Sequence, residues 1–225
     1  IDSMAMQEIE DALQKIWTNP KYKEISKGEH YVYPVIKPEV DILFIGINPS
    51  FNKDHDNVRF YEFTEKLLSI PYFKAFDEFA KGVRDFAGTS GVTWTHIDLL
   101  FFRETEQNKI HTILKETNGA AFIYEQLKVA EKLIIYAKPK VVIVCNTLAR
   151  LFLGKEQNPN AHQEKDRHIW LGYKFGEIDL EIGTYILDGK PWFFSGMLSG
   201  QRALDKGSLE RLEWQVKVVL KKIKS

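Results

Sequence analysis

Residues 41–48 read DILFIGIN, a short and almost continuously apolar run that ends at Pro49. This pattern is typical of a strand in a parallel sheet, where helices bury both of its faces. Three further stretches have the composition of core strands: 92–100, 141–145 (VVIVC) and 191–197 (PWFFSGM). Residues 169–187 are also β-rich, and we interpret them as a hairpin.

Stretches with helical character separate these strands. In residues 5–18 the apolar side chains recur on one helical face. Further helices are expected over 57–87, broken at Pro71, and over 118–137, with Asn118 as its cap. A short helix capped by Asn146 and Thr147 should end at Gly154. The last helix is expected over 205–223, and its inward face would consist of Leu209, Leu212, Val216, Val219 and Ile223. Strands that alternate with helices predict an α/β fold, here a three-layer α/β/α sandwich with a mainly parallel central sheet. We expect residues 1–225 to form a single domain, in which 1–40 supply an N-terminal helix and an irregular lead-in.

Composition excludes several classes of protein. The 225 residues include 31 Lys plus Arg and 31 Asp plus Glu, so bulk charge cannot hold the chain to nucleic acid, although a locally basic groove stays open. The single cysteine, Cys145, excludes an internal disulfide and a four-cysteine cluster. The six histidines include no HxH or HExxH pair, so we expect no metal and no cofactor. No apolar run approaches the ~20 residues of a membrane span and no signal peptide is evident, so we expect a cytoplasmic protein without a membrane partner.

Ligands of such sheets bind beyond the carboxyl ends of the strands, which directs attention to residues 46–51, 97–103 and 195–202. At the first of these strand exits, Gly46 permits close backbone approach and Pro49 fixes a sharp turn. The amide of Asn48 would therefore be held at the sheet edge, where it could orient a water or bond to a planar base. Asn48 could equally cap a turn.

The stretch Gly46-Ile47-Asn48-Pro49-Ser50 resembles the first motif of the uracil-DNA glycosylase superfamily, and is closest to the GINPG of its mismatch-specific thymine/uracil branch. His55 and Phe60 fall at the spacings of that branch's histidine and base-stacking phenylalanine. The GVT at 91–93 recurs there as well, and 141–154 is similar to the family's penultimate strand–helix unit.

The second family motif is matched in part at the last strand exit. Met197 and Ser199 agree with it, whereas Leu198 stands where the family has proline. Branches that excise uracil fastest have a histidine at the position of Met197, which stabilises the leaving base. Since Met197 cannot donate a hydrogen bond, we expect a slow enzyme or one specialised for another lesion.

The resemblance covers about residues 40–220 and implies a monomeric DNA glycosylase. Such an enzyme flips uracil or a related damaged or mismatched base out of duplex DNA, or takes it from single strands, and hydrolyses its N-glycosidic bond. The resemblance assigns the attacking water to Asn48, stacking on the base to Phe60, and the base oxygens to backbone amides around Ile47 and Phe51. Gly46 and Met197 would complete the base site, and the DNA contacts would come from Ser50, His55, Ser199, Gly200, Gln201 and Arg202.

Several alternatives stay open at this stage. Asp98 lies near a position where several branches have an asparagine that reads the base edge, but an ionised aspartate only accepts hydrogen bonds, and Asp98 could instead cap a helix or pair with Arg103. Phe60 could belong to the core, His96 could be structural, and 199–202 could be a plain turn. A catalytically silent relative that binds a base, nucleotide or nucleic acid fits the same residues. A different enzyme on this scaffold is a third possibility, although FSGML at 194–198 lacks the second glycine of a serine hydrolase elbow.

Overall fold

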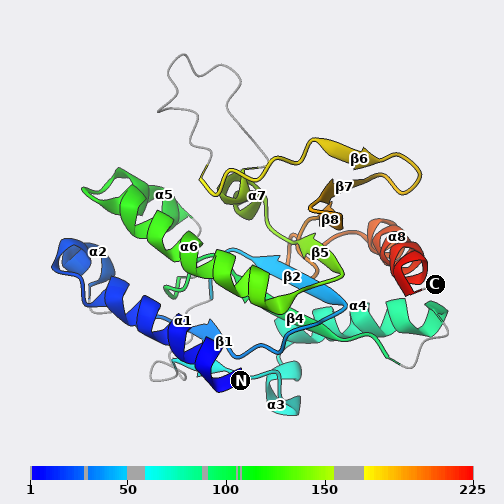
Figure 1. Cartoon of the computed structure of the whole chain (residues 1–225), viewed down its shortest axis with the longest axis horizontal. Coiled ribbons are helices and arrows are strands. Elements are labelled where there is room, and N and C mark those ends of the chain that lie inside the picture. The colour runs from blue at the N-terminus through cyan, green and yellow to red at the C-terminus, as the bar shows by residue number, and fades with distance from the viewer. Residues whose placement is uncertain are drawn as a thin grey trace.

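The chain has an α/β architecture built around a six-stranded sheet (Figure 1). The computed structural model describes residues 2–27, 30–49, 59–87, 91–104, 106, 108–154 and 170–224. The strands are β2 (Ile42–Gly46), β4 (Trp94–Asp98), β5 (Val141–Val144), β6 (Glu177–Asp179), β7 (Thr184–Leu187) and β8 (Lys190–Phe194). Their order across the sheet is β4-β2-β5-β8-β7-β6. The first four in this order are parallel to one another. Strand β7 pairs antiparallel with β8, and β6 pairs antiparallel with β7, so the sheet is mixed and the expected hairpin is confirmed.

Helices cover both faces of this sheet. One face is covered by α1 (Asp2–Trp17), α5 (Asn108–Lys115), α6 (Gly119–Ala137) and α7 (Thr147–Leu153), and the other by α4 (Pro71–Ala87) and α8 (Lys206–Lys224). The alternation along β2 explains this arrangement. Leu43 and Ile45 pack with the first set of helices, and Ile42 and Phe44 with the second. None of the described helices is long and apolar enough to cross a membrane.

A second, two-stranded parallel sheet lies beside the N-terminal helices. It consists of β1 (Tyr33–Pro34) and β3 (Phe60–Tyr61), and the lead-in before it contains the short helices η1 (Pro20–Tyr22) and α2 (Lys23–Ser26). The prediction of helix from residue 57 is therefore wrong at its start, since helix begins with α3 (Glu65–Leu68). Two residues held by backbone bonds to a distant segment leave no periodic signal in the sequence.

The predicted inward faces are confirmed for most helices. The predicted residues of α1 (Met6, Ile9, Leu13 and Ile16) and of α6 (Ile123, Leu127, Ala130 and Ile134) are buried. In α8 the prediction is wrong at its end, because Ile223 is 46% exposed while Leu220 is buried.

The two predicted helix caps differ in outcome. Asn146 accepts hydrogen bonds from the backbone N–H groups of Leu148 and Ala149, as a cap should. Asn118 stands at the N-cap position of α6, as predicted, but it has a left-handed φ of 66° and its side chain makes no cap bond. In this conformation Asn118 forms the turn into α6, and only its carbonyl joins the helix, through the N–H of Phe122.

Candidate active site

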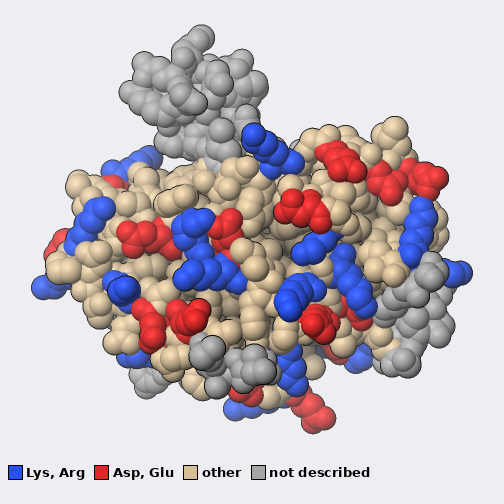
Figure 2. Space-filling view, viewed as in Figure 1, with Lys and Arg blue, Asp and Glu red and all other residues tan. Residues whose placement is uncertain are grey.

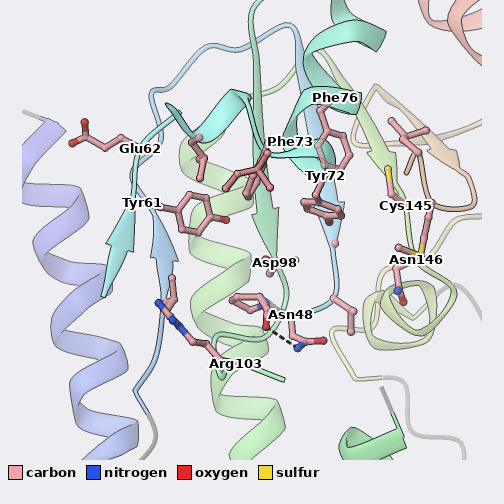
Figure 3. A pocket seen from close by; sticks show the side chains of 18 of the residues that line it. Asn48, Tyr61, Glu62, Tyr72, Phe73, Phe76, Asp98, Arg103, Cys145 and Asn146 are labelled. Atoms are coloured by element: carbon pink, nitrogen blue, oxygen red, sulfur yellow. Dashed lines mark hydrogen bonds between the residues drawn. The ribbon is translucent and has the colours of Figure 1, made fainter. Parts of the chain in front are cut away.

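A pocket of about 750 Å³ opens at the carboxyl ends of β2 and β4. Its wall comes from these strand ends, from the residues that follow β5 and β8, and from β3, α3 and α4 (Figure 3). Single bound ligands in proteins occupy pockets of this size. Six of the residues predicted for the site meet in its lining: Gly46, Ile47, Asn48, Phe60, Asp98 and Met197.

Asn48 lies at the floor of this pocket with its side chain fixed by the backbone. Its Nδ2 donates to the carbonyl of Glu104 at 2.6 Å and to that of Pro49 at 3.1 Å. Figure 3 marks one of these bonds and shows the amide oxygen turned the other way. Because both donors are used, the direction of the amide oxygen is set before any ligand binds.

The loop after β4 supplies this clamp. The N–H of Leu100 donates to Ile47 O at 2.8 Å, and the N–H of Glu104 donates to Pro49 O at 3.0 Å. The parallel register of β2 and β4 thus continues beyond the strands and brings the two exits together. Asn48 is held between the two strand exits. Its side chain is therefore more constrained than that of an asparagine that only caps an exposed turn.

Asp98 ends β4 and lines the same pocket, only 5% exposed. Its Oδ1 has no hydrogen-bond partner among the described residues, and its nearest basic atom is Nε2 of His96 at 3.9 Å. The pairing with Arg103 that the sequence left open is not formed in the described part of the chain. Burial raises the pKa of Asp98 to about 8, because an ionised carboxylate would be poorly solvated here. At neutral pH this side chain is therefore mostly a neutral acid.

His96 supports the pocket from behind and does not line it. Its ring is fully buried, and its Nε2 lies 3.1 Å from the hydroxyl oxygen of Tyr72 on α4. Burial lowers the pKa of His96 to about 3, so the ring is neutral at physiological pH. We conclude that His96 is a packed structural residue that holds Tyr72 in the pocket wall.

Phe60 and Tyr61 of β3 form the aromatic side of the pocket. Phe60 is 50% exposed, so it does not belong to the core, and its ring is accessible from the pocket. The hydroxyl of Tyr61 is buried without a partner in the described structure. Burial, together with the neighbouring Asp98, raises the pKa of Tyr61 well above its usual value. The phenol therefore keeps its proton and can donate a hydrogen bond into the pocket.

The segment after β8 reaches the pocket rim. Met197 and Leu198 line the pocket, and the four residues that follow form a closed loop. Leu204 N–H donates to Met197 O at 2.9 Å, and Gly200 provides the turn with a φ of 85°. Of the predicted DNA contacts, Ser199 is half-buried, whereas Gly200, Gln201 and Arg202 are exposed on this loop.

Three predicted site residues, Ser50, Phe51 and His55, lie outside the described residues. Sequence analysis missed several polar residues of the lining, among them Tyr61, Tyr72, Arg103 and Asn146. For Asn146 a signal existed, because it directly follows β5 and so lies at the same sheet edge as Asn48. It was interpreted only as a helix cap, which it also is.

Among the residues described on the pocket lining, none is a strong nucleophile. Cys145 is buried there, and burial raises the pKa of its thiol far above neutrality, so the reactive thiolate is absent. Among the described residues, no three His, Cys, Asp or Glu side chains gather in a way that could hold a metal ion.

Charge on the molecular surface is mixed. On the face shown in Figure 2, basic and acidic side chains are interspersed, in keeping with the zero formal net charge. No protein-family model matches this chain, and no curated protein matches its sequence significantly.

Proposed function

We propose that this protein is a DNA base-excision glycosylase that flips uracil or a related damaged or mismatched base and hydrolyses its N-glycosidic bond. The observation that carries the proposal is the fixed amide of Asn48, clamped by two backbone carbonyls at the floor of a base-sized pocket. A flipped base needs an aromatic surface on which to stack, and the half-exposed Phe60 provides one in the same pocket.

The proposed reaction does not need a strong acid or base in the site. The bond from C1′ to the base nitrogen breaks, its electron pair leaves with the base, and the sugar gains oxocarbenium character. A water held by the Asn48 oxygen adds to C1′ and gives up a proton, and the departing base gains a proton in turn. Because the sugar is already cationic at this stage, a positioned water suffices without a strong general base. Preorganisation of Asn48 lowers the barrier by fixing that water in place beforehand.

The proposal also includes the type of fold, the contact with DNA and the oligomeric state. We infer that the mixed sheet, with helices on both faces, is the uracil-DNA glycosylase-like arrangement. In this arrangement the 199–202 loop would enter the DNA beside the flipped base. We propose a monomer that acts on DNA in the cytoplasm and needs neither a cofactor nor a membrane partner.

A second function is a catalytically silent protein that binds a base, nucleotide or nucleic acid through the same pocket. One observation favours it: Met197 and Leu198 line the wall where a leaving base would need a hydrogen-bond donor, and neither side chain can donate. This candidate predicts binding without product.

A single-turnover cleavage assay separates the two functions. The substrates are labelled duplex and single-stranded oligonucleotides that contain uracil, mismatched thymine, hypoxanthine or xanthine. We expect alkali-labile sites from the wild type and a rate lower by on the order of a hundredfold or more for Asn48→Ala. Asn108→Ala, an exposed asparagine that does not line the pocket, is the matched control. Binding of these oligonucleotides with no cleavage at high enzyme would support the silent relative instead.

A further inference from the structure

Two buried polar groups on the pocket wall have no hydrogen-bond partner among the residues that the structure describes. These are Oδ1 of Asp98 and the hydroxyl of Tyr61, which come from different strands, β4 and β3. A buried polar atom without a hydrogen bond costs free energy, so such atoms are rare in folded proteins unless a ligand satisfies them. Both residues line the pocket, and Figure 3 shows them on the side opposite Cys145 and Asn146.

We propose that Asp98, as a neutral carboxylic acid, and Tyr61 together read the edge of the bound base and select one with an imide edge. An imide edge has a ring N–H between two carbonyl groups, as in uracil, thymine and xanthine. The neutral acid donates to one carbonyl and accepts from the N–H, while Tyr61 donates to the other carbonyl. The inference rests on the proposed function in that it takes the ligand to be a nucleobase.

Geometry supports the neutral state of Asp98. A carboxylate in an aromatic, water-poor wall needs a cation or several donors, and Oδ1 has neither in the described structure. The titratable neighbours are His96 on β4, Tyr61 on β3, Tyr72 on α4 and Cys145, which directly follows β5. Burial keeps each of them uncharged at neutral pH. Charged residues elsewhere on the pocket wall are Glu62, Lys66, Arg103 and Glu104.

The selection follows from matching donors to acceptors. Hypoxanthine has a C–H where uracil and xanthine have the second carbonyl, so the hydroxyl of Tyr61 would be left without an acceptor. N3-methyluracil lacks the N–H and adds a methyl group in its place. If Asp98 ionised, it would lose its donor and face a carbonyl with negative charge, which also predicts weaker binding at alkaline pH.

The test is equilibrium dialysis of labelled free bases, together with binding of duplexes that contain a 2′-fluoro-deoxyuridine whose glycosidic bond resists hydrolysis. We expect uracil and xanthine to bind, and hypoxanthine and N3-methyluracil to bind at least tenfold more weakly. Since burial raises the pKa of Asp98 to about 8, wild-type affinity for uracil should fall about tenfold between pH 7 and pH 9.

Substitutions distinguish a role in base recognition from a role in protein stability. Asp98→Asn cannot ionise, so its affinity should change with pH only as the base itself titrates, whereas Glu62→Gln, which removes an exposed carboxyl from the same pocket, should keep the wild-type decline. Tyr61→Phe should weaken binding roughly two- to tenfold. Its stability should be unchanged or higher, because the hydroxyl it removes has no partner; a merely structural tyrosine would show the opposite.

Each outcome decides one of the two proposals. A wild-type affinity that is flat from pH 7 to pH 9, equal binding of hypoxanthine and xanthine, or no binding of any base would overturn the inference about Asp98 and Tyr61. Excision that depends on Asn48 but shows a flat binding profile would leave the glycosylase proposal standing alone. If the wild type shows the expected binding pattern but excises no base, the inference about Asp98 and Tyr61 would be supported and the glycosylase proposal would be rejected.

Discussion

Gly46 of β2 and Asp98 of β4 are register partners, and the carboxyl of Asp98 occupies the space where a side chain on Gly46 would begin. A Cβ atom on Gly46 would collide with Oδ1 of Asp98 and would lie 3.0 Å from Nε2 of His96. The glycine thus allows a buried acid to sit at the end of the neighbouring strand. This relationship links the most recognisable motif of the sequence to the group that we propose reads the base.

Gly46→Ala should therefore damage both stability and base binding. The methyl group has nowhere to go, because β4 and α4 are packed on either side, and overpacking of this kind costs about 1–3 kcal/mol. Urea unfolding should show this loss, and Gly46→Ala combined with Asp98→Ala should recover part of it by removing the colliding carboxyl. Gly176→Ala is the control, since a Cβ there meets nothing within 4 Å. Equal stability of the Gly46→Ala and Gly176→Ala proteins would contradict the described packing.

The stability of the protein should decline from pH 6.5 to pH 8. In this window an unfolded Asp98 is ionised while the folded one keeps its proton, so unfolding releases a proton and becomes easier as pH rises. With a folded pKa of about 8, the free energy of unfolding should fall by about 2 kcal/mol across the window. Denaturation of wild type and Asp98→Asn at several pH values measures this, and the decline should be absent from the variant. Parallel curves for the two proteins would show that Asp98 is ionised in the folded state.

The same linkage gives the acidic side of the profile. Below pH 6.5 an unfolded His96 gains a proton that the folded ring, with its pKa of about 3, does not bind. Between about pH 4 and 6.5 this effect opposes that of Asp98, so the two cancel and stability is nearly flat. Between about pH 4 and the folded pKa of about 3, Asp98 no longer offsets the effect of His96, so stability falls with acidification.

The features of this protein that could be predicted from the sequence are those that depend on local interactions. The run at 41–48 defines β2 because continuous apolar residues must be covered on both faces, and the helical periodicities of α1 and α6 define the layer that covers one of them. These signals also predicted the sheet edge at which Asn48 and Asp98 meet. The protonation state of Asp98 was not predictable, because it depends on burial by residues from β3, β5 and α4.

The residues that sequence analysis missed depend on long-range contacts. Tyr61 lies in a stretch of helical composition, and only its pairing with Pro34 makes it part of a strand that faces the pocket. Tyr72 reads as one of several aromatics at the start of α4. Its place in the pocket wall depends on the contact with His96, which is 24 residues away in the chain.

Phe60→Ala should weaken base binding with little effect on folding. Its ring is half exposed, so truncation removes little buried surface, whereas loss of a stacking partner costs about 1–3 kcal/mol of binding, roughly five- to 150-fold in affinity. Titration of the 2′-fluoro-deoxyuridine duplex measures this loss, with the melting temperature recorded alongside. Trp214→Ala is the control, because Trp214 is a similarly exposed aromatic residue on α8 that does not line the pocket. Similar losses of affinity in both variants would remove Phe60 from the base site.

Arg202→Ala should weaken duplex binding and leave the binding of free uracil unchanged. Arg202 is exposed on the loop that follows Met197 at the pocket rim, which suits contact with a phosphate and not with the base. From Arg202 to the C-terminus, seven Lys or Arg residues stand against three acidic ones, so much of the positive charge available to DNA lies in this part of the chain. Loss of one phosphate contact should reduce the slope of log affinity against log salt by about one.

Lys221→Ala, which removes an exposed cation near the end of α8, is the matched control and should leave the slope as it is if the contact belongs to the loop. Unchanged slopes in both variants would show that the 199–202 loop does not touch the DNA backbone, and the DNA interface would then have to lie elsewhere around the pocket.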